Sequence, residues 1–252
     1  MRENIILISP SSLKFFSEWY EINEKLKKAT YSFRISVKAL EELGISLFDI
    51  LNLYTGRLVA FIIYEAYIDS EKEPDYQLII ACELLDIILF HLLDDIIDRN
   101  NNLYVSYYGE SKILALSIPI IFEIVNKYPF FSKIIRFYEY DYYKPSSLKE
   151  YLRKLVFSSF YPLEIIFDYI KPNKQIRKFW KITSQYLKIL DDIKDNDTFL
   201  DKSTLIELAK NFEREMIIQS TTPLQKNFVN YLIINRNSDI LEETDIKISL
   251  LK

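Results

Sequence analysis

Apolar residues recur at spacings of three and four along most of the chain, the pattern of helices that bury one face. Polar, glycine- or proline-bearing stretches interrupt this pattern, and no stretch shows the alternation of a run of strands. The chain is therefore predicted to be all-α, with a polar tail from about residue 237 that is expected to be loose. The predicted helices cover residues 18–53 (two helices with a joint near Gly44), 56–67, 75–98, 110–128, 146–169, 175–195, 204–220 and 224–235.

Composition narrows the class of protein. With 252 residues, 49% of them hydrophobic, the chain can bury one large core, so we predict a single domain over residues 1–252. Three glycines are too few for a Rossmann or P-loop protein or a turn-rich β-sandwich. The net charge of −4, with both signs well mixed, gives no indication of a nucleic-acid surface.

The cysteine count and the length of the apolar runs indicate the cellular compartment in which the protein is expected. The single cysteine, Cys82, excludes disulfides within the chain, which fits a reducing cytoplasm. The N-terminus lacks a signal-peptide pattern, and no uncharged apolar run reaches the roughly 18 residues of a membrane span. We therefore expect a soluble, cytoplasmic protein without a transmembrane segment.

Two acidic clusters with the same spacing, Asp-Asp-x-x-Asp, each follow an apolar helical run. The first cluster is Asp94, Asp95 and Asp98, and the second is Asp191, Asp192 and Asp195. Residues four apart share a helix face, where like charges repel by a few tenths of a kcal/mol per pair. Both clusters also lie near predicted helix C-termini, where carboxylates oppose the helix dipole. A single cluster would usually be a solvated helix end, but two in this context favour divalent cations, and Mg²⁺ prefers such oxygen ligands.

Around these clusters the sequence resembles the trans-isoprenyl diphosphate synthases (the polyprenyl synthetase family). The similar segments keep the family's order and spacing over about residues 56 to 206. They are Gly56-Arg57-Leu58-Val59-Ala60, Glu83-Leu84-Leu85 with Leu92 to Asp98, Tyr108-Gly109-Glu110-Ser111-Lys112-Ile113-Leu114-Ala115, Leu190 to Asp195, and Asp197 to Leu205.

The resemblance implies a helical bundle of the isoprenoid synthase type, in which the two Asp-rich helices face a central cavity. The six aspartates would hold two or three Mg²⁺ ions on an allylic isoprenyl diphosphate. The metal ions would help the diphosphate to leave, and the prenyl group would pass to isopentenyl diphosphate. Homodimers are usual in the family, so we expect a homodimer, with a heterodimer as the alternative.

The residues that bind a second diphosphate depart from the family pattern. Val59 and Ala60 stand where the family has Arg and Pro, and an Arg-Arg pair is missing after the first cluster. The family's Lys-Thr reads Ser158-Ser159, and its Phe-Gln reads Leu187-Lys188. Lys202 is the one clearly retained basic contact. Substitute cations are expected from Arg57, Arg99, Lys112 or Lys188.

Two further residues lie close before the first cluster. Phe90, four residues before Asp94, is in the family the position that limits product length, although core packing explains it equally well. His91, the only histidine, is predicted to be a structural helix residue rather than a catalytic one.

These departures leave three functions open. The first is a Mg²⁺-dependent prenyltransferase that uses isopentenyl diphosphate or a non-standard acceptor. The second is a terpene cyclase-like enzyme on the same fold, which needs no second diphosphate site. The third is a non-catalytic regulatory subunit of a prenyl synthase, although such a subunit would not need all six aspartates.

Overall fold

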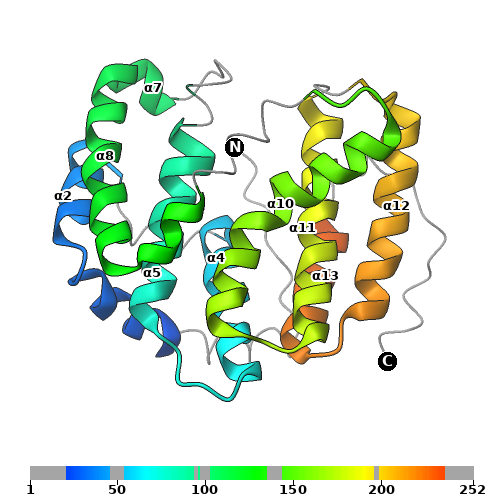
Figure 1. Cartoon of the computed structure of the whole chain (residues 1–252), viewed down its shortest axis with the longest axis horizontal. Coiled ribbons are helices and arrows are strands. Elements are labelled where there is room, and N and C mark those ends of the chain that lie inside the picture. The colour runs from blue at the N-terminus through cyan, green and yellow to red at the C-terminus, as the bar shows by residue number, and fades with distance from the viewer. Residues whose placement is uncertain are drawn as a thin grey trace. The chain divides into compact units, whose positions relative to one another are not determined.

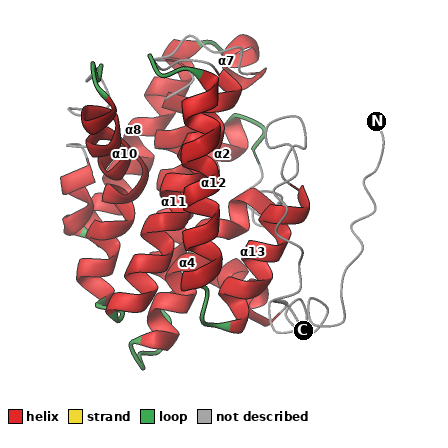
Figure 2. Ribbon diagram, turned by 90° about the vertical axis from the view of Figure 1, so that its right-hand side faces the viewer, coloured by secondary structure: helices red, strands yellow, loops and turns green. Residues whose placement is uncertain are grey.

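The computed structural model describes residues 21–45, 54–93, 96, 103–134, 144–195 and 199–235. Within these ranges every regular element is a helix, and Figure 2 shows the helices joined by loops with no strand. The predicted all-α class is therefore confirmed for the described part of the chain. None of the helices in these ranges combines the length and the apolar character that crossing a bilayer requires.

The chain divides into two compact units, Met1–Lys133 and Ile134–Lys252. In the first unit, α8 packs against α2 and α5, and α4 packs against α5 (Figure 1). The prediction of a single domain over residues 1–252 stays a prediction. The helices from residue 21 to Ile134 are a helix over 21–30, α2 (Arg34–Glu42), α4 (Tyr54–Asp69), α5 (Tyr76–Leu85), the π-helix η1 (Asp86–Leu93), α7 (Leu103–Tyr108), α8 (Glu110–Lys127) and the 3-10 helix η2 (Pro129–Ile134).

Helix α5 forms the centre of the first unit. Every residue from Leu78 to Leu85 is buried, as expected of a helix that is apolar on all sides. Asp75 caps its N-terminus by accepting hydrogen bonds from the N–H groups of Gln77 (3.0 Å) and Leu78 (3.1 Å). The other carboxylate oxygen accepts a hydrogen bond from the Tyr128 hydroxyl at 2.9 Å, which ties the start of α5 to the end of α8.

The predicted helix over 75–98 is α-helical only as far as Leu85 and continues as the π-helix η1 up to Leu93. A π-helix forms i→i+5 hydrogen bonds, and such segments frequently adjoin functional sites. The π-helix is described as far as Leu93, and Asp94, the next residue in the sequence, is the first of the first acidic cluster. Residues four apart share a face in an α-helix, but not in the wider π-helix. The π-helix therefore changes which side chains of this segment lie on the same face.

The first predicted helix pair has an additional break. The joint expected near Gly44 is confirmed at its start, since α2 ends at Glu42 and Gly44 adopts a φ of +65°. A turn at Tyr31 and Ser32 also separates the helix over 21–30 from α2. There the Thr30 and Ser32 hydroxyls donate to the carbonyls of the preceding turn at 2.7 Å each, and such local bonds compete with helix continuation. The short helix α7 was not predicted.

Glu83 is a carboxyl group inside the apolar part of α5. It is completely buried, and its Oε1 accepts a hydrogen bond from the Ala60 N–H of α4 at 2.8 Å. Oε2 has no hydrogen-bond partner among the described residues. Burial raises the pKa of Glu83 well above its usual range, and the nearby charge of Asp86 raises it further. The fold therefore favours the protonated, uncharged form of this side chain.

The second unit is built around α11, which lies between α10 and α12 (Figure 1). Its buried face carries Phe179, Trp180 and Tyr186 at helical spacing. Ser147 caps the start of α10, and Lys171 closes it in a left-handed conformation with a φ of 64°. All four helices begin and end within about two residues of their predicted bounds. They are α10 (Leu148–Ile170), α11 (Lys174–Asp195), α12 (Lys202–Gln219) and α13 (Pro223–Asn235).

A buried hydrogen bond joins α11 to α12 and gives a first testable prediction. The Tyr186 hydroxyl donates to Glu213 Oε2 at 2.9 Å, and both side chains are buried. Tyr186→Phe should lower the free energy of unfolding by about 2 kcal/mol, because a buried carboxyl group loses a hydrogen-bond donor. Urea unfolding measures this change. Tyr107→Phe, at an 81% exposed tyrosine, is the control, with an expected change under about 0.5 kcal/mol. Equal midpoints for the two variants would contradict the prediction.

Candidate functional site

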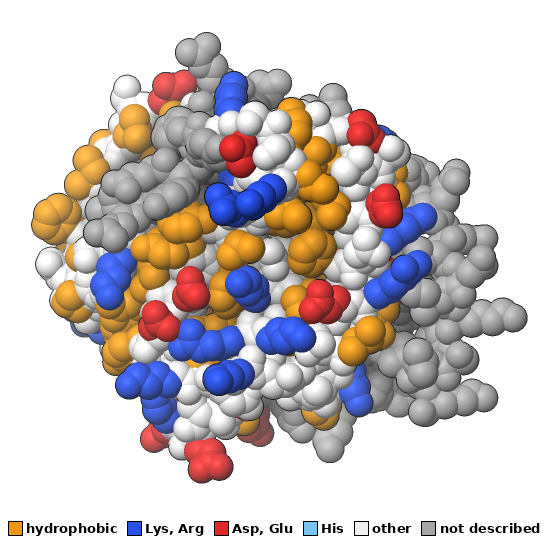
Figure 3. Space-filling model, turned by 45° about the vertical axis from the view of Figure 1, so that its right-hand side comes forward, with side chains coloured by type: hydrophobic (Ala, Val, Ile, Leu, Met, Phe, Trp, Pro, Cys, Tyr) orange, Lys and Arg blue, Asp and Glu red, His pale blue; other side chains and the backbone are white. Residues whose placement is uncertain are grey.

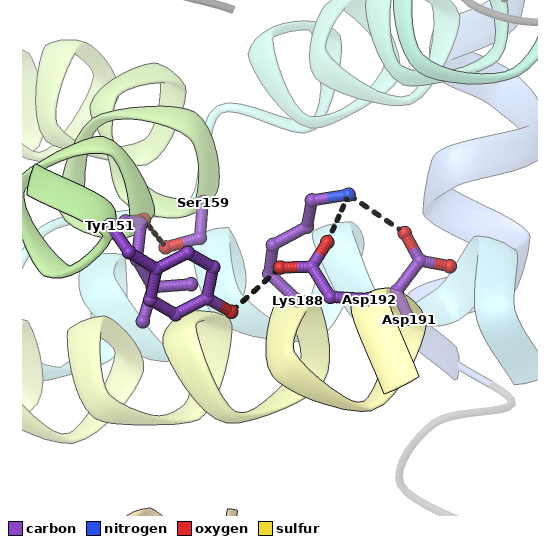
Figure 4. Close-up of polar contacts among 6 residues, drawn as sticks. Tyr151, Ser159, Lys188, Asp191 and Asp192 are labelled. Carbon is purple, nitrogen blue, oxygen red and sulfur yellow. Dashed lines mark hydrogen bonds and ion pairs between the residues drawn. The ribbon is translucent and has the colours of Figure 1, made fainter. Parts of the chain in front are cut away.

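The second acidic cluster lies at the C-terminal end of α11, where the structure describes two of its three carboxylates. Asp192 Oδ2 accepts a hydrogen bond from the Tyr151 hydroxyl of α10 at 2.7 Å. The ammonium of Lys188 lies 3.1 Å from Asp192 Oδ1 and 2.9 Å from Asp191 Oδ2. Figure 4 shows Lys188 reaching both carboxylates, with Tyr151 on the opposite side of Asp192. We call Tyr151, Lys188, Asp191 and Asp192 the α11 carboxylate site.

The two carboxylates of the α11 carboxylate site have different environments. The Asp192 side chain is 8% exposed, whereas the Asp191 side chain is 49% exposed. Burying a carboxylate costs free energy unless it is paired and hydrogen-bonded, and Lys188 and Tyr151 supply an ion pair and a hydrogen bond to Asp192. Asp191 therefore presents its charge to solvent, while Asp192 is held in one position by neighbours on two helices.

The charge of Lys188 is set by the same contacts. Burial alone would lower the pKa of its ammonium, but the charges of Asp192 and Asp191 and the hydrogen bonds to both raise that pKa above its usual value. Lys188 was predicted as a substitute cation for a second diphosphate. In the structure its ammonium contacts the carboxylates of its own helix, because residues three and four apart share a helix face. Its contact with a diphosphate stays a prediction.

Ser159 and Lys202 stand where the resemblance gives the family contacts for diphosphate. The Ser159 hydroxyl donates to the Leu155 carbonyl of its own helix at 2.5 Å (Figure 4). Lys202 is the exposed first residue of α12. Neither observation assigns a ligand to these residues.

The segment around Lys202 has a clear structural role at the start of α12. The Asp201 carboxylate accepts hydrogen bonds from the Ser203 hydroxyl and from the Thr204 N–H (2.9 Å) and hydroxyl (2.8 Å). These bonds, that of Ser203 first, lower the pKa of Asp201 to about 2. Side-chain capping of this kind is favoured at helix N-termini, so the Asp-Lys-Ser-Thr sequence is explained by helix initiation as well as by the resemblance.

The other predicted site residues fall wholly or partly outside the described structure. Asp94, Asp95, Asp98 and Arg99 lie outside the described residues. The backbones of Arg57 in α4, Phe90 and His91 in η1, and Asp195 at the end of α11 are described, but their side chains are not. Lys112, a further predicted cation, donates to the Glu42 carbonyl at 3.2 Å and lies over the Tyr108 ring.

The described donors give a partial fit to a Mg²⁺ site. Asp191 and Asp192 supply the carboxylate oxygens that Mg²⁺ prefers, but Lys188 contacts one oxygen of each. Among the described side chains, no group of three or more Asp, Glu, His or Cys gathers as it would around a metal ion. With the first cluster and Asp195 outside this set, the six-aspartate magnesium site stays a prediction.

Five residues of α10 line a hollow that was not predicted from the sequence. Three apolar side chains, Leu148, Leu152 and Val156, line it together with Lys149 and Arg153. Both basic residues are exposed. This combination suits an amphiphilic anion, because the alkyl part meets apolar side chains and the anionic part meets cations. The spacing of Leu148, Leu152 and Val156 by four residues was a readable signal of this face.

No family model, no curated protein and no solved structure matches the chain. The resemblance to the isoprenyl diphosphate synthases therefore rests on the order and spacing of the sequence motifs.

On the face drawn in Figure 3, basic side chains are interspersed with acidic and apolar ones, in keeping with the mixed charge of the sequence.

Proposed function

We propose that the chain is a Mg²⁺-dependent prenyltransferase of the isoprenyl diphosphate synthase type. It would ionise an allylic isoprenyl diphosphate and pass the prenyl group to isopentenyl diphosphate or to a non-standard acceptor. The observation that carries the proposal is the α11 carboxylate site, in which Asp192 is fixed by Tyr151 and Lys188 while Asp191 reaches solvent. The second Asp-Asp-x-x-Asp motif at residues 94–98 supports it from the sequence.

The charges of the site suit a diphosphate only when cations are present. Two carboxylates by themselves would repel a diphosphate, so a fixed or bound cation is required. Mg²⁺ held by the aspartates would supply the Lewis acid that stabilises the leaving diphosphate. From the chain itself, Lys188 adds one fixed positive charge, and Tyr151 keeps Asp192 in a single orientation. Lys149 and Arg153 of α10 are further cations that were not predicted.

One observation favours a second candidate function, the non-catalytic subunit of a prenyl synthase. Lys188 already contacts both described carboxylates, so it takes oxygens that a metal ion would use. A subunit that had lost metal binding could keep its acidic helix folded in this way. The two candidates differ in whether the isolated chain releases pyrophosphate.

The deciding experiment measures pyrophosphate release with Mg²⁺ from geranyl, farnesyl and geranylgeranyl diphosphates, each with and without isopentenyl diphosphate. Products are analysed by mass. A chain carrying both Asp191→Asn and Asp192→Asn, prepared in parallel, controls for contaminating synthases. Elongated products that require isopentenyl diphosphate support the proposal, and hydrocarbons or alcohols formed without it indicate a cyclase or another acceptor. No release above the control from any substrate would refute the enzyme and leave the subunit.

A further inference from the structure

The hollow along α10 combines an apolar row with two cations. Leu148, Leu152 and Val156 follow one another at intervals of four residues, so the row extends over about 12 Å of the helix. Leu148 is 43% exposed, and the other two are half-buried. Lys149 and Arg153 lie alongside this row about one turn apart, and both are exposed. We call these five residues the α10 hollow, which has a volume of about 770 Å³.

The α10 hollow lies on a different side of α10 from the α11 carboxylate site. Tyr151 points toward Asp192 of α11, to which its hydroxyl donates a hydrogen bond at 2.7 Å (Figure 4). Lys149 and Arg153 stand two residues before and after Tyr151, and two residues turn an α-helix by about 200°. These two cations therefore face away from Asp192, and the α10 hollow is a separate site.

The two cations of the α10 hollow lack a counter-charge within the described part of the chain, where neither Lys149 nor Arg153 forms an ion pair or a hydrogen bond. Glu150 is the one acidic residue within four positions of either, and its Oε2 accepts hydrogen bonds from the N–H (2.8 Å) and hydroxyl (2.7 Å) of Ser146. Like charges four residues apart repel on a helix, and a cation in the first turn, such as Lys149, opposes the helix dipole. A bound anion would relieve both effects.

The two charges and the apolar row together indicate the class of ligand. A phosphate ester of one alkyl chain carries close to two negative charges near neutral pH, which matches two cations, whereas a carboxylate carries only one. The guanidinium of Arg153 can contact two phosphate oxygens, and Lys149 adds a point charge. An alkyl chain attached to the phosphate then covers the apolar row, which removes apolar surface from water.

We propose that the α10 hollow binds the phosphate ester of a long alkyl chain, with the phosphate between Lys149 and Arg153 and the chain along Leu148, Leu152 and Val156. The inference does not rest on the proposed function, because it needs neither a metal ion nor a residue of the α11 carboxylate site.

Titration calorimetry of the full chain with dodecyl phosphate tests the proposal. The ligand is kept below its critical micelle concentration, and EDTA is present so that no metal ion bridges the phosphate to the aspartates. We expect one saturable site per chain. Butyl phosphate should bind at least about 10-fold more weakly, because it buries fewer methylene groups.

Removal of charge locates the phosphate. A chain carrying both Lys149→Gln and Arg153→Gln should bind dodecyl phosphate at least about 10-fold more weakly than the wild type, because both charge-assisted contacts are lost. The control chain carries Lys174→Gln and Lys178→Gln, which remove the same charge from exposed positions of α11. It should bind as the wild type does.

A polar substitution in the apolar row locates the alkyl chain. Leu148→Asn should weaken the binding of dodecyl phosphate at least about 3-fold, because part of the chain loses its apolar contact. Leu114→Asn on α8 is the matched control, since Leu114 is 46% exposed and Leu148 is 43% exposed. It should leave the binding unchanged and so excludes general adsorption of the ligand to apolar surface.

Three results would overturn the proposal. The first is the lack of saturable binding of dodecyl phosphate to the wild-type chain. The second is binding by the Lys149→Gln, Arg153→Gln chain that is as tight as that of the wild type. The third is co-sedimentation with phosphatidylglycerol vesicles without any binding of monomeric dodecyl phosphate, which would assign the α10 hollow to an anionic bilayer surface instead of a single-chain phosphate ester.

Discussion

Replacing Lys188 by glutamine is expected to destabilise the chain in the absence of metal and to make it more responsive to Mg²⁺. The ammonium lies 3.1 Å from Asp192 Oδ1 and 2.9 Å from Asp191 Oδ2, so Lys188→Gln leaves two neighbouring carboxylates without their cation. Losing one partner of a buried charge costs several kcal/mol. The Lys188 side chain is 33% exposed, however, so water replaces part of the contact, and we expect a loss of about 1–2 kcal/mol.

The metal response separates a structural ion pair from a cation site. In Lys188→Gln the two carboxylates have no ammonium to compete with Mg²⁺, and binding to the folded state raises its stability by mass action. Millimolar Mg²⁺ should therefore raise the melting temperature of the variant more than that of the wild type. Thermal unfolding with and without Mg²⁺, supported by calorimetric titration of the metal, measures both effects.

The same helix supplies the control. Lys178 of α11 pairs with Glu215 at 3.7 Å, and both side chains are about half exposed. Lys178→Gln should change the free energy of unfolding by about 0.5 kcal/mol or less, because exposed ion pairs contribute little. Its Mg²⁺ response should equal that of the wild type. A Lys188→Gln chain that is destabilised but gains no Mg²⁺ response would show that the site is a structural ion pair without affinity for metal.

The ends of the helices were predictable wherever a regular apolar spacing of three and four residues stopped at polar residues, glycine or proline. The helices α8 and α11 begin and end within about two residues of the predicted positions, because polar residues, Gly109 or Pro172 flank each apolar pattern. The π-helix η1 was not predictable in this way. The segment before it is buried on all sides, so its apolar residues do not recur at a spacing that marks one helix face. The sequence therefore cannot distinguish a π-helix from an α-helix there.

The candidate site was predictable in its residue types but only partly in its contacts. The pairing of Lys188 with Asp192 follows from their spacing of four residues on one helix. The contact of Lys188 with a diphosphate, expected because the family's own basic residues are missing, stays a prediction. The contact of Tyr151 with Asp192 spans 41 positions and two helices, so a single sequence could not reveal it. The difference in burial between Asp191 and Asp192 depends on that same helix packing.

Replacing Glu83 by glutamine is expected to stabilise the chain increasingly as the pH rises. Burial raises the pKa of Glu83 in the folded state well above its usual range. Below about pH 4 the side chain is protonated in both the folded and the unfolded chain, so it makes no pH-dependent contribution. Above that pH the unfolded chain releases the proton and the folded chain keeps it. Stability therefore falls by up to about 1.4 kcal/mol per pH unit until the raised pKa is passed.

Glutamine at position 83 removes this proton linkage while its carbonyl still accepts the hydrogen bond from the Ala60 N–H. The difference in free energy of unfolding between Glu83→Gln and the wild type should therefore grow from pH 5 to pH 8, because all other titrating groups cancel in the comparison. Urea unfolding at both pH values measures it. Glu110→Gln, at an exposed carboxylate in the first turn of α8, should differ from the wild type by about 0.5 kcal/mol or less. A Glu83→Gln difference that is the same at both pH values would mean that the buried carboxyl group ionises within the folded chain as readily as in the unfolded one.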